Sequence, residues 1–235
     1  MPEPLVLIPG MMCDARLYWP QIVAFSADRS VHVAPLVGGS ISAMAQNILL
    51  GAPKRFSVLG LSMGGIVAME MMNKDPGRIS RAVLMDTNPL PETPQNAAER
   101  EPQIIGVRNG RLIEVMRDMM KPAYLAPGPQ RMDVLSLMMD MAEAMGPECF
   151  VNQSRALQRR PDQQRTLSQT QIPTLVACGE HDTLCPLKRH EMMAELIPNS
   201  VLHIFRDAGH LPTLEQPMAV NEALRAFLDQ PLVLR

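Results

Sequence analysis

Short apolar segments recur along the chain, and each has the length of a buried strand. They contain few polar positions and show no strict alternation of polar and apolar residues. Segments that are apolar at consecutive positions are typical of parallel strands covered on both faces. We expect six such strands, at residues 5–8, 31–34, 56–59, 82–85, 174–177 and 201–205.

Helical patterns lie between the predicted strands. Residues 66–72 form one such pattern, which ends before Pro76. Val220, Leu224 and Phe227 recur at helical spacing in another. Alternating strands and helices predict an α/β fold with a mostly parallel sheet and right-handed connections.

The alternation stops between about residues 87 and 169, where helix-like stretches replace the strands. Two of them, residues 111–121 and 130–145, are bounded by glycine and proline. Their apolar faces are too rich in methionine to be solvated, so we expect them to cover another part of the molecule. We therefore predict a core formed by residues 1–86 and 170–235 and an all-helical cap formed by residues 87–169. The methionines of this cap are Met116, Met119, Met120, Met132, Met138, Met139, Met141 and Met145.

A serine flanked by glycines directly follows the third predicted strand. The sequence Gly60-Leu61-Ser62-Met63-Gly64 matches G-x-S-x-G, a sharp strand-to-helix turn that lifts the serine above the carboxyl edge of a sheet. The hydroxyl would also lie at a helix N-terminus, where backbone N–H groups favour developing negative charge. A glycine-rich turn alone would explain the pattern, but the strand before and the helix after it favour a nucleophile.

A serine nucleophile needs a base, and the chain offers five histidines. We expect His32 and His203, inside apolar strands, to be core residues, and His190, in a charged helical stretch, to lie at the surface. His181 follows the fifth predicted strand and remains an alternative. His210 is the best placed, because it follows the last predicted strand in a loop.

The base in turn needs an orienting acid. Asp182 follows the fifth predicted strand and is our choice, while Asp86, at the end of the fourth, is the competitor. The resulting order along the chain is Ser62, Asp182 and His210, which differs from the orders of the chymotrypsin and subtilisin scaffolds.

Four motifs between residues 5 and 217 carry a resemblance to a known family. In combination they resemble the α/β-hydrolase superfamily, and within it the small bacterial esterase-like members. The resemblance covers nearly the whole chain and implies a sheet of about six strands, flanked by helices, with a helical cap inserted in it. The motifs are Leu7-Ile8-Pro9-Gly10-Met11, Gly60-Leu61-Ser62-Met63-Gly64-Gly65, Gly179-Glu180-His181-Asp182 and the segment from Gly209-His210 to Glu215-Gln216-Pro217.

The same resemblance implies an oxyanion hole made by the backbone N–H groups of Met11 and Met63. Family members usually have His-Gly where this chain has Pro9-Gly10, so we expect the local support of this loop to differ. The implied activity is that of a serine carboxylesterase, which needs no metal or organic cofactor. A thioesterase, a lactonase, a C–C hydrolase or a non-catalytic receptor for a small ligand are the alternatives.

Composition narrows the range of partners. The formal net charge of −2 lacks the basic excess that nucleic-acid binding requires. No cluster of arginine or lysine lies near the motifs in the sequence, so we expect short to medium apolar acyl esters rather than phosphorylated substrates. The first residues lack a signal-peptide pattern and no apolar run is long enough for membrane insertion, which predicts a cytoplasmic protein. The oligomeric state is not predicted.

Overall fold

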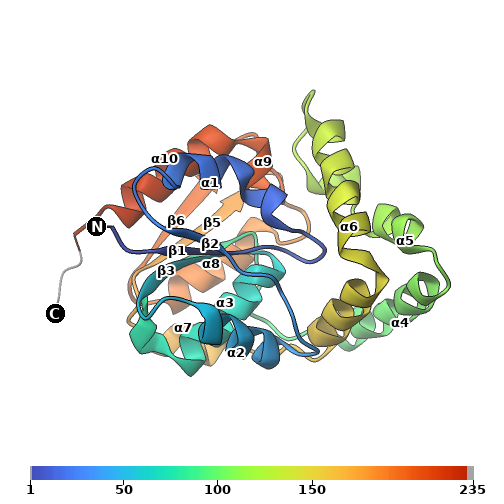
Figure 1. Cartoon of the computed structure of the whole chain (residues 1–235), viewed down its shortest axis with the longest axis horizontal. Helices are drawn as coiled ribbons and strands as arrows, with labels where there is room; N and C mark the ends of the chain where they lie inside the picture. Colours follow the sequence, from blue (N-terminus) through green and yellow to red (C-terminus); the bar gives the residue numbers. More distant parts are fainter. Residues whose placement is uncertain (1, 232–235) are drawn as a thin grey trace.

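A six-stranded parallel sheet lies at the centre of the computed structural model, which describes residues 2–231 (Figure 1). The strand order is β2-β1-β3-β4-β5-β6, and every neighbouring pair is parallel. The predicted fold class is therefore confirmed. The strands are β1 Leu5–Ile8, β2 Val31–Val33, β3 Phe56–Leu61, β4 Ile79–Met85, β5 Thr174–Gly179 and β6 Ser200–Phe205.

The central strands β3, β4 and β5 are buried at every position, whereas the edge strands are not. The prediction that His32 and His203 are core residues is wrong, because both side chains are exposed. They lie on β2 and β6, which have a neighbouring strand on one side only and are incompletely covered by helices. An apolar run therefore does not by itself distinguish an edge strand from a central one.

Helices cover both faces of the sheet (Figure 1). On one face, α1 and α10 contact each other, and Phe25 and Leu224 join the apolar cluster that contains Leu7 and Leu59. On the other face lie α2, α3, α7 and α8, whose apolar side chains pack with the alternate strand positions. The bounds of these core helices are α1 Trp19–Phe25, α2 Ile41–Gly51, α3 Met63–Lys74, α8 Leu187–Leu196, α9 Pro212–Glu215 and α10 Pro217–Leu228.

A helical insertion separates β4 from β5 and projects from one side of the sheet (Figure 1). Its helices α4, α5 and α6 pack on one another, whereas α7 contacts α3 and α8 of the core. The division of the chain after residues 86 and 169 stays a prediction. The bounds are α4 Pro94–Arg108, α5 Leu112–Met119, α6 Arg131–Gln158 and α7 Gln164–Gln169, with short 3-10 helices at Ala15–Tyr18, Pro76–Arg78 and Pro122–Tyr124.

The longest helix of the insertion bends where the sequence places a glycine and a proline. Gly146 has φ 78° and ψ 173°, which interrupts α6, but Pro147 then starts a new helical stretch. Proline is well tolerated in a first helical turn, where its missing N–H has no intrahelical partner. The predicted end of this helix at Met145 is therefore confirmed, and a second helical stretch that the pattern did not predict continues to Gln158.

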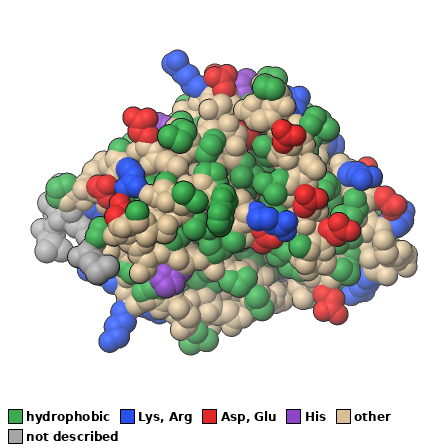
Figure 2. Space-filling model, turned by 45° about the horizontal axis from the view of Figure 1, so that its top comes forward, with side chains coloured by type: hydrophobic (Ala, Val, Ile, Leu, Met, Phe, Trp, Pro, Cys, Tyr) green, Lys and Arg blue, Asp and Glu red, His purple; other side chains and the backbone are tan. Residues whose placement is uncertain are grey.

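Most methionines of the insertion pack in or against the main apolar cluster, whereas Met132 is 66% exposed. Met116, Met120, Met138 and Met141 are buried in the cluster that includes the sheet residue Leu59. Figure 2 shows hydrophobic side chains gathered along the middle of one face, with most charged side chains toward its edges. Among residues 2–231, no helix has the length and apolar character needed to cross a membrane.

The burial of β3 predicts a large difference between two leucine substitutions. Leu59 is 0% exposed on the central strand, whereas Leu50 is 76% exposed on α2. Leu59→Ala should lower the free energy of unfolding by about 2–5 kcal/mol through lost contacts and a cavity. Leu50→Ala should change it by less than about 0.5 kcal/mol. Urea denaturation followed by circular dichroism measures both, and equal losses would contradict the described packing.

Candidate active site

Ser62 lies in a strained turn between β3 and α3. Its φ is 55° and its ψ is −118°, a conformation that non-glycine residues rarely adopt. A Cβ at Gly60 would collide with the backbone of Gly64, and one at Gly64 would collide with the carbonyl oxygen of Ile8. Only glycine therefore permits the strand and the helix to approach so closely, and the strain falls on Ser62.

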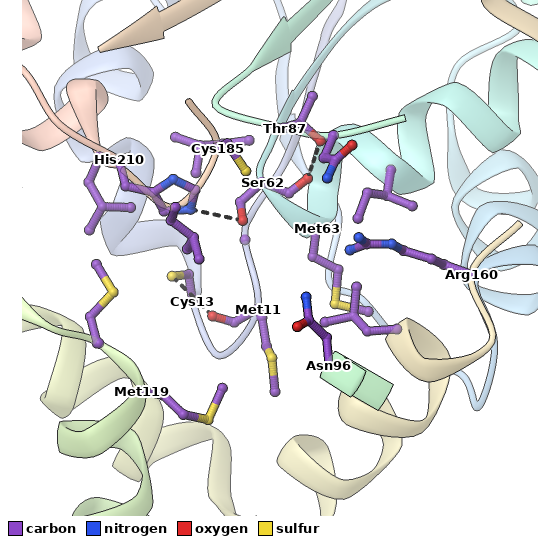
Figure 3. Close-up of a pocket in the computed structure, with 18 of the residues that line it drawn as sticks. Met11, Cys13, Ser62, Met63, Thr87, Asn96, Met119, Arg160, Cys185 and His210 are labelled. Atoms are coloured by element: carbon purple, nitrogen blue, oxygen red, sulfur yellow. Dashed lines mark hydrogen bonds between the residues drawn. The ribbon is translucent and has the colours of Figure 1, made fainter. Parts of the chain in front are cut away.

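The end of β4 holds the backbone of Ser62 at both its polar groups. The Ser62 N–H donates to the carbonyl oxygen of Met85 at 2.9 Å, and the Thr87 hydroxyl donates to the Ser62 carbonyl oxygen at 2.7 Å (Figure 3). These two hydrogen bonds fix the backbone of the strained turn, while the Ser62 hydroxyl remains available to other groups.

His210 lies in the loop after β6 and faces Ser62. Its Nε2 is 3.0 Å from the Ser62 Oγ (Figure 3), and its side chain is almost completely buried. The backbone N–H of His210 donates to the carbonyl oxygen of Tyr124 at 2.7 Å, so the insertion also positions this loop.

Glu215 is a site residue whose role the sequence pattern does not reveal, although it lies in one of the four motifs. Its carboxylate accepts hydrogen bonds from the N–H groups of Gly209 at 3.0 Å and Leu211 at 2.9 Å, on either side of His210. It also accepts from the N–H of Ala126 in the insertion at 2.7 Å. One buried carboxylate therefore joins the histidine loop to the insertion.

Asp182 lies in the loop after β5 and binds the other nitrogen of the histidine ring. Its Oδ2 is 2.8 Å from the His210 Nδ1, and its Oδ1 accepts from the N–H groups of Leu184 and Cys185 at 2.8 and 2.9 Å. Burial alone would raise the pKa of the Asp182 carboxyl, but the attraction and hydrogen bond of His210 and the backbone donor at Cys185 outweigh it and lower the pKa. Since an ionised carboxylate only accepts, the His210 Nδ1 carries the proton.

Asp86, the competing acid, has a different environment. It is completely buried, and one carboxyl oxygen accepts from the Gly179 N–H at 2.9 Å while the other has no partner within residues 2–231. Burial, and then the charge of Asp182, raise the pKa of Asp86 well above its ordinary value. No hydrogen bond joins it to His210 in the described part of the chain, so Asp86 is a buried neutral neighbour of the ionised Asp182.

Within residues 2–231, the side chains of the other histidines and of the cysteines make no hydrogen bond to the side chains of Ser62, His210 or Asp182. The expectation that His190 is at the surface is wrong: it is buried, and its Nε2 accepts from the Thr87 N–H at 3.1 Å. The charged residues around it on α8 face outward while His190 faces the sheet, where burial lowers its pKa to about 4. Burial likewise raises the pKa of the Cys13 thiol to about 12, which makes it a poor nucleophile.

Three ligand-type side chains of the site lie close together. Asp182, Cys185 and His210 offer atoms within 4.8 Å of one another. Burial, and then the charge of Asp182, raise the pKa of Cys185 well above its ordinary value, so its thiol is a weak metal ligand. Asp182 and His210 already bind each other, so this arrangement suits proton transfer better than metal binding.

The loop after β1 contributes to the cavity beside Ser62. Met11 lines the cavity beside Ser62, and no residue of the described chain accepts a hydrogen bond from its N–H. The next residue, Met12, has φ 55° and donates its N–H to the side-chain oxygen of Gln153 on α6 at 2.8 Å. This loop contains Pro9-Gly10 in place of the usual His-Gly, and Gln153 of the insertion supports it. The Met63 N–H, in the first turn of α3, has no intrahelical acceptor either.

A cavity of about 240 Å³ adjoins Ser62 and His210. In the view of Figure 3, Met119 lies on one side of Ser62, and Arg160 and Asn96 lie on the other. The apolar part of the wall comes from methionines of the insertion, and the polar part includes the two arginines Arg100 and Arg160. The sequence pattern does not reveal these arginines, because both are far from the four motifs along the chain.

Comparison with known proteins agrees with the fold described above. The sequence model of the alpha/beta hydrolase family matches residues 5–223. The chain belongs to this family. The predicted resemblance is thereby confirmed, and it places the fold described above among alpha/beta hydrolases.

Relatives of this alpha/beta hydrolase cover nearly its whole length. A pimeloyl-(acyl-carrier protein) methyl ester esterase of Aliivibrio fischeri is 25% identical over 240 residues, 96% of this chain and 93% of the relative. The solved structure of a thermophilic esterase from Thermogutta terrifontis, with malate bound, has a TM-score of 0.88 at 27% identity and covers 97% of this chain and 89% of its own. An enol-lactonase from Burkholderia xenovorans LB400, at 20% identity, a TM-score of 0.85 and coverage of 98% and 92%, shows the fold alone. The family model and the two esterase relatives support hydrolase activity of the esterase type.

The two buried aspartates predict opposite outcomes for the same substitution. Asp182→Asn should lower kcat for an ester by about a thousandfold or more, because an amide cannot hold the His210 ring in the required tautomer. Asp86→Asn should retain activity within about tenfold, since Asp86 makes no hydrogen bond to His210 in the described chain. Steady-state kinetics of both variants checks this, and an Asp86 variant as inactive as the Asp182 variant would contradict the assignment.

The raised pKa of Asp86 also predicts a pH-dependent difference in stability. Above the ordinary pKa of about 4, the unfolded chain has lost this proton while the folded chain keeps it, so this group lowers stability as pH rises toward its folded pKa. Asp86→Asn cannot ionise, so the variant should gain stability relative to wild type as the pH rises from about 4 toward neutral. Urea denaturation across this range measures the difference, and a difference constant with pH would mean that Asp86 ionises normally in the fold.

Proposed function

We propose that this alpha/beta hydrolase is a serine carboxylic-ester hydrolase with Ser62 as nucleophile, His210 as general base and Asp182 as the acid that orients it. One observation carries the proposal: the Ser62 Oγ, the His210 ring and the Asp182 carboxylate form a continuous relay of 3.0 and 2.8 Å contacts. The strained backbone of Ser62 supports the same assignment, since strain of this kind is concentrated at functional sites.

The first half of the reaction transfers the acyl group to the enzyme. The Ser62 oxygen attacks the carbonyl carbon while its proton passes to the Nε2 of His210, and the carbonyl oxygen becomes an oxyanion. Asp182 stabilises the imidazolium that forms. When the tetrahedral intermediate collapses, the bond to the alcohol oxygen breaks, and the alcohol leaves with the proton from Nε2. Ser62 then carries the acyl group as an ester.

The second half releases the acid by the same steps with water as nucleophile. His210 accepts a proton from water, the hydroxide oxygen adds to the acyl carbon, and collapse returns the proton to the Ser62 oxygen. The N–H groups of Met11 and Met63 are the proposed donors to the oxyanion in both halves, each contributing about 3 kcal/mol to transition-state stabilisation. No step requires a metal or an organic cofactor.

The cavity wall supports esters with an apolar chain of short to medium length. Met116, Met119 and Met138 supply flexible, polarizable side chains that adapt to such chains. The relatives named as methyl ester esterases support an ester as the bond that is cleaved. Lactones and thioesters would pass through the same intermediates, so they are alternative substrates of the same residues.

Substitution of Ser62 tests the proposal. Ser62→Ala should lower hydrolysis of p-nitrophenyl esters by about a millionfold or to background, because nucleophile and base act as one unit. A ladder of esters from acetate to laurate, measured spectrophotometrically, should show its highest kcat/KM at short to medium chain length.

The matched control for this test is Ser168→Ala, which removes an exposed hydroxyl on α7 and should leave the rates unchanged. A fluorophosphonate probe should label wild type and not Ser62→Ala. Folded wild-type protein that neither reacts with the probe nor hydrolyses any ester would refute the proposal and favour a non-catalytic receptor.

A further inference from the structure

Two arginines reach the cavity from the place where the insertion joins the core. Arg100 lies on α4 and Arg160 follows α6, and both line the same cavity as Ser62. Only 15% and 11% of their side-chain surfaces are exposed. Two largely buried guanidinium groups are unusual in the wall of a cavity whose other side chains suit an apolar chain.

The charges of this wall do not cancel. Glu92 forms ion pairs with both arginines, at 2.8 Å to the Nη2 of Arg100 and 3.3 Å to the Nη2 of Arg160. One carboxylate therefore faces two guanidinium groups, and one positive charge remains. The exposed Arg189 adds to the positive potential at Arg160 rather than reducing it. A buried charge without a full partner is costly, which favours an anionic ligand at this place.

Arg160 also has a donor group left for a ligand. Its Nε donates to the carbonyl oxygen of Leu90 at 2.9 Å, and its Nη2 lies beside Glu92. Its Nη1 has no acceptor among residues 2–231. These contacts fix the plane of the guanidinium group while leaving one edge for a ligand in the cavity, and a carboxylate fits such an edge.

We propose that Arg160, assisted by Arg100, binds a carboxylate carried by the ester substrate. Preferred substrates then have a scissile ester at Ser62 and an apolar segment that ends in the carboxylate. The single net charge of the wall matches a carboxylate better than a doubly charged phosphate. This inference rests on the proposed function and replaces the expectation of wholly apolar acyl groups.

Paired esters that differ only in the charged group provide the test. Monomethyl adipate and methyl hexanoate match in length, with a carboxylate in place of a methyl group. The acetate ester of ω-hydroxyhexanoate and hexyl acetate are the corresponding pair with the charge on the alcohol side. In at least one pair, wild type should favour the charged member by about tenfold or more in kcat/KM. A preference for the neutral member in both pairs would overturn the inference.

Variants at two arginine positions identify the responsible residue. Arg160→Met should lower the ratio of charged to neutral turnover by about tenfold or more, and Arg160→Lys should lower it less. Arg159→Met, which removes the exposed neighbouring arginine outside the cavity, should leave the ratio unchanged. Thermal unfolding checks that each variant is folded. If the variants at both positions shift the ratio equally, general surface charge is responsible and the inference fails.

Binding to the Ser62→Ala protein separates this inference from the proposed function. Calorimetry should detect adipate binding that disappears with the added Arg160→Met change, whether or not wild type hydrolyses esters. Tighter binding of inorganic phosphate than of adipate would overturn the carboxylate assignment. Ser62-dependent ester hydrolysis in which Arg160→Met leaves the ratio of charged to neutral turnover unchanged would overturn the inference alone and leave the proposed function standing.

Discussion

The close approach of β3 to the first turn of α3 is the constraint on which the rest of the site depends. No Cβ fits at Gly60 or Gly64, so the chain must turn within one residue, and Ser62 takes the left-handed backbone that such a turn requires. A conformation of this kind costs about 1–3 kcal/mol. The burial of both flanking elements in the sheet and its covering helices offsets that cost, and two hydrogen bonds to the end of β4 hold the serine in place.

Parallel pairing then brings the remaining groups to the same edge of the sheet. Because neighbouring strands run in one direction, the residues that follow β3, β4, β5 and β6 meet at their carboxyl ends. Two carboxyl groups arrive there together, and their surroundings separate their pKa values. The Asp182 carboxylate accepts hydrogen bonds from His210 and from two backbone N–H groups and is ionised. The Asp86 carboxyl accepts one hydrogen bond and remains neutral. The same edge thus supplies a charged acid and a buried uncharged one.

The sequence pattern predicts the strands and the turn at Ser62 well. It predicts poorly the features that depend on residues far apart in the chain. Continuous apolar runs located all six strands, and the motif around Ser62 located the turn, because both depend on neighbouring residues. The exposure of His203 and the burial of His190 depend on which face each element turns to the core, and an apolar or charged run does not contain that information. Helix α4 was not predicted, since its polar residues and Pro102 hide its helical character. Arg100 and Arg160 come together only because the insertion returns to the core beside its starting point.

The insertion starts and ends at neighbouring places on the core, and it can therefore shape several parts of the site at once. Gln153 supports the loop that carries Met11, and the backbone of Tyr124 and Ala126 holds the histidine loop directly and through Glu215. The insertion also supplies the methionine wall and the arginine pair. A displacement of its helices would therefore alter the loop that carries Met11, the position of His210 and the shape of the cavity together. Since hydrogen bonds to the end of β4 and the next residues hold Ser62, changes in the insertion act on the cavity and on the positioning of His210 while Ser62 itself stays in place.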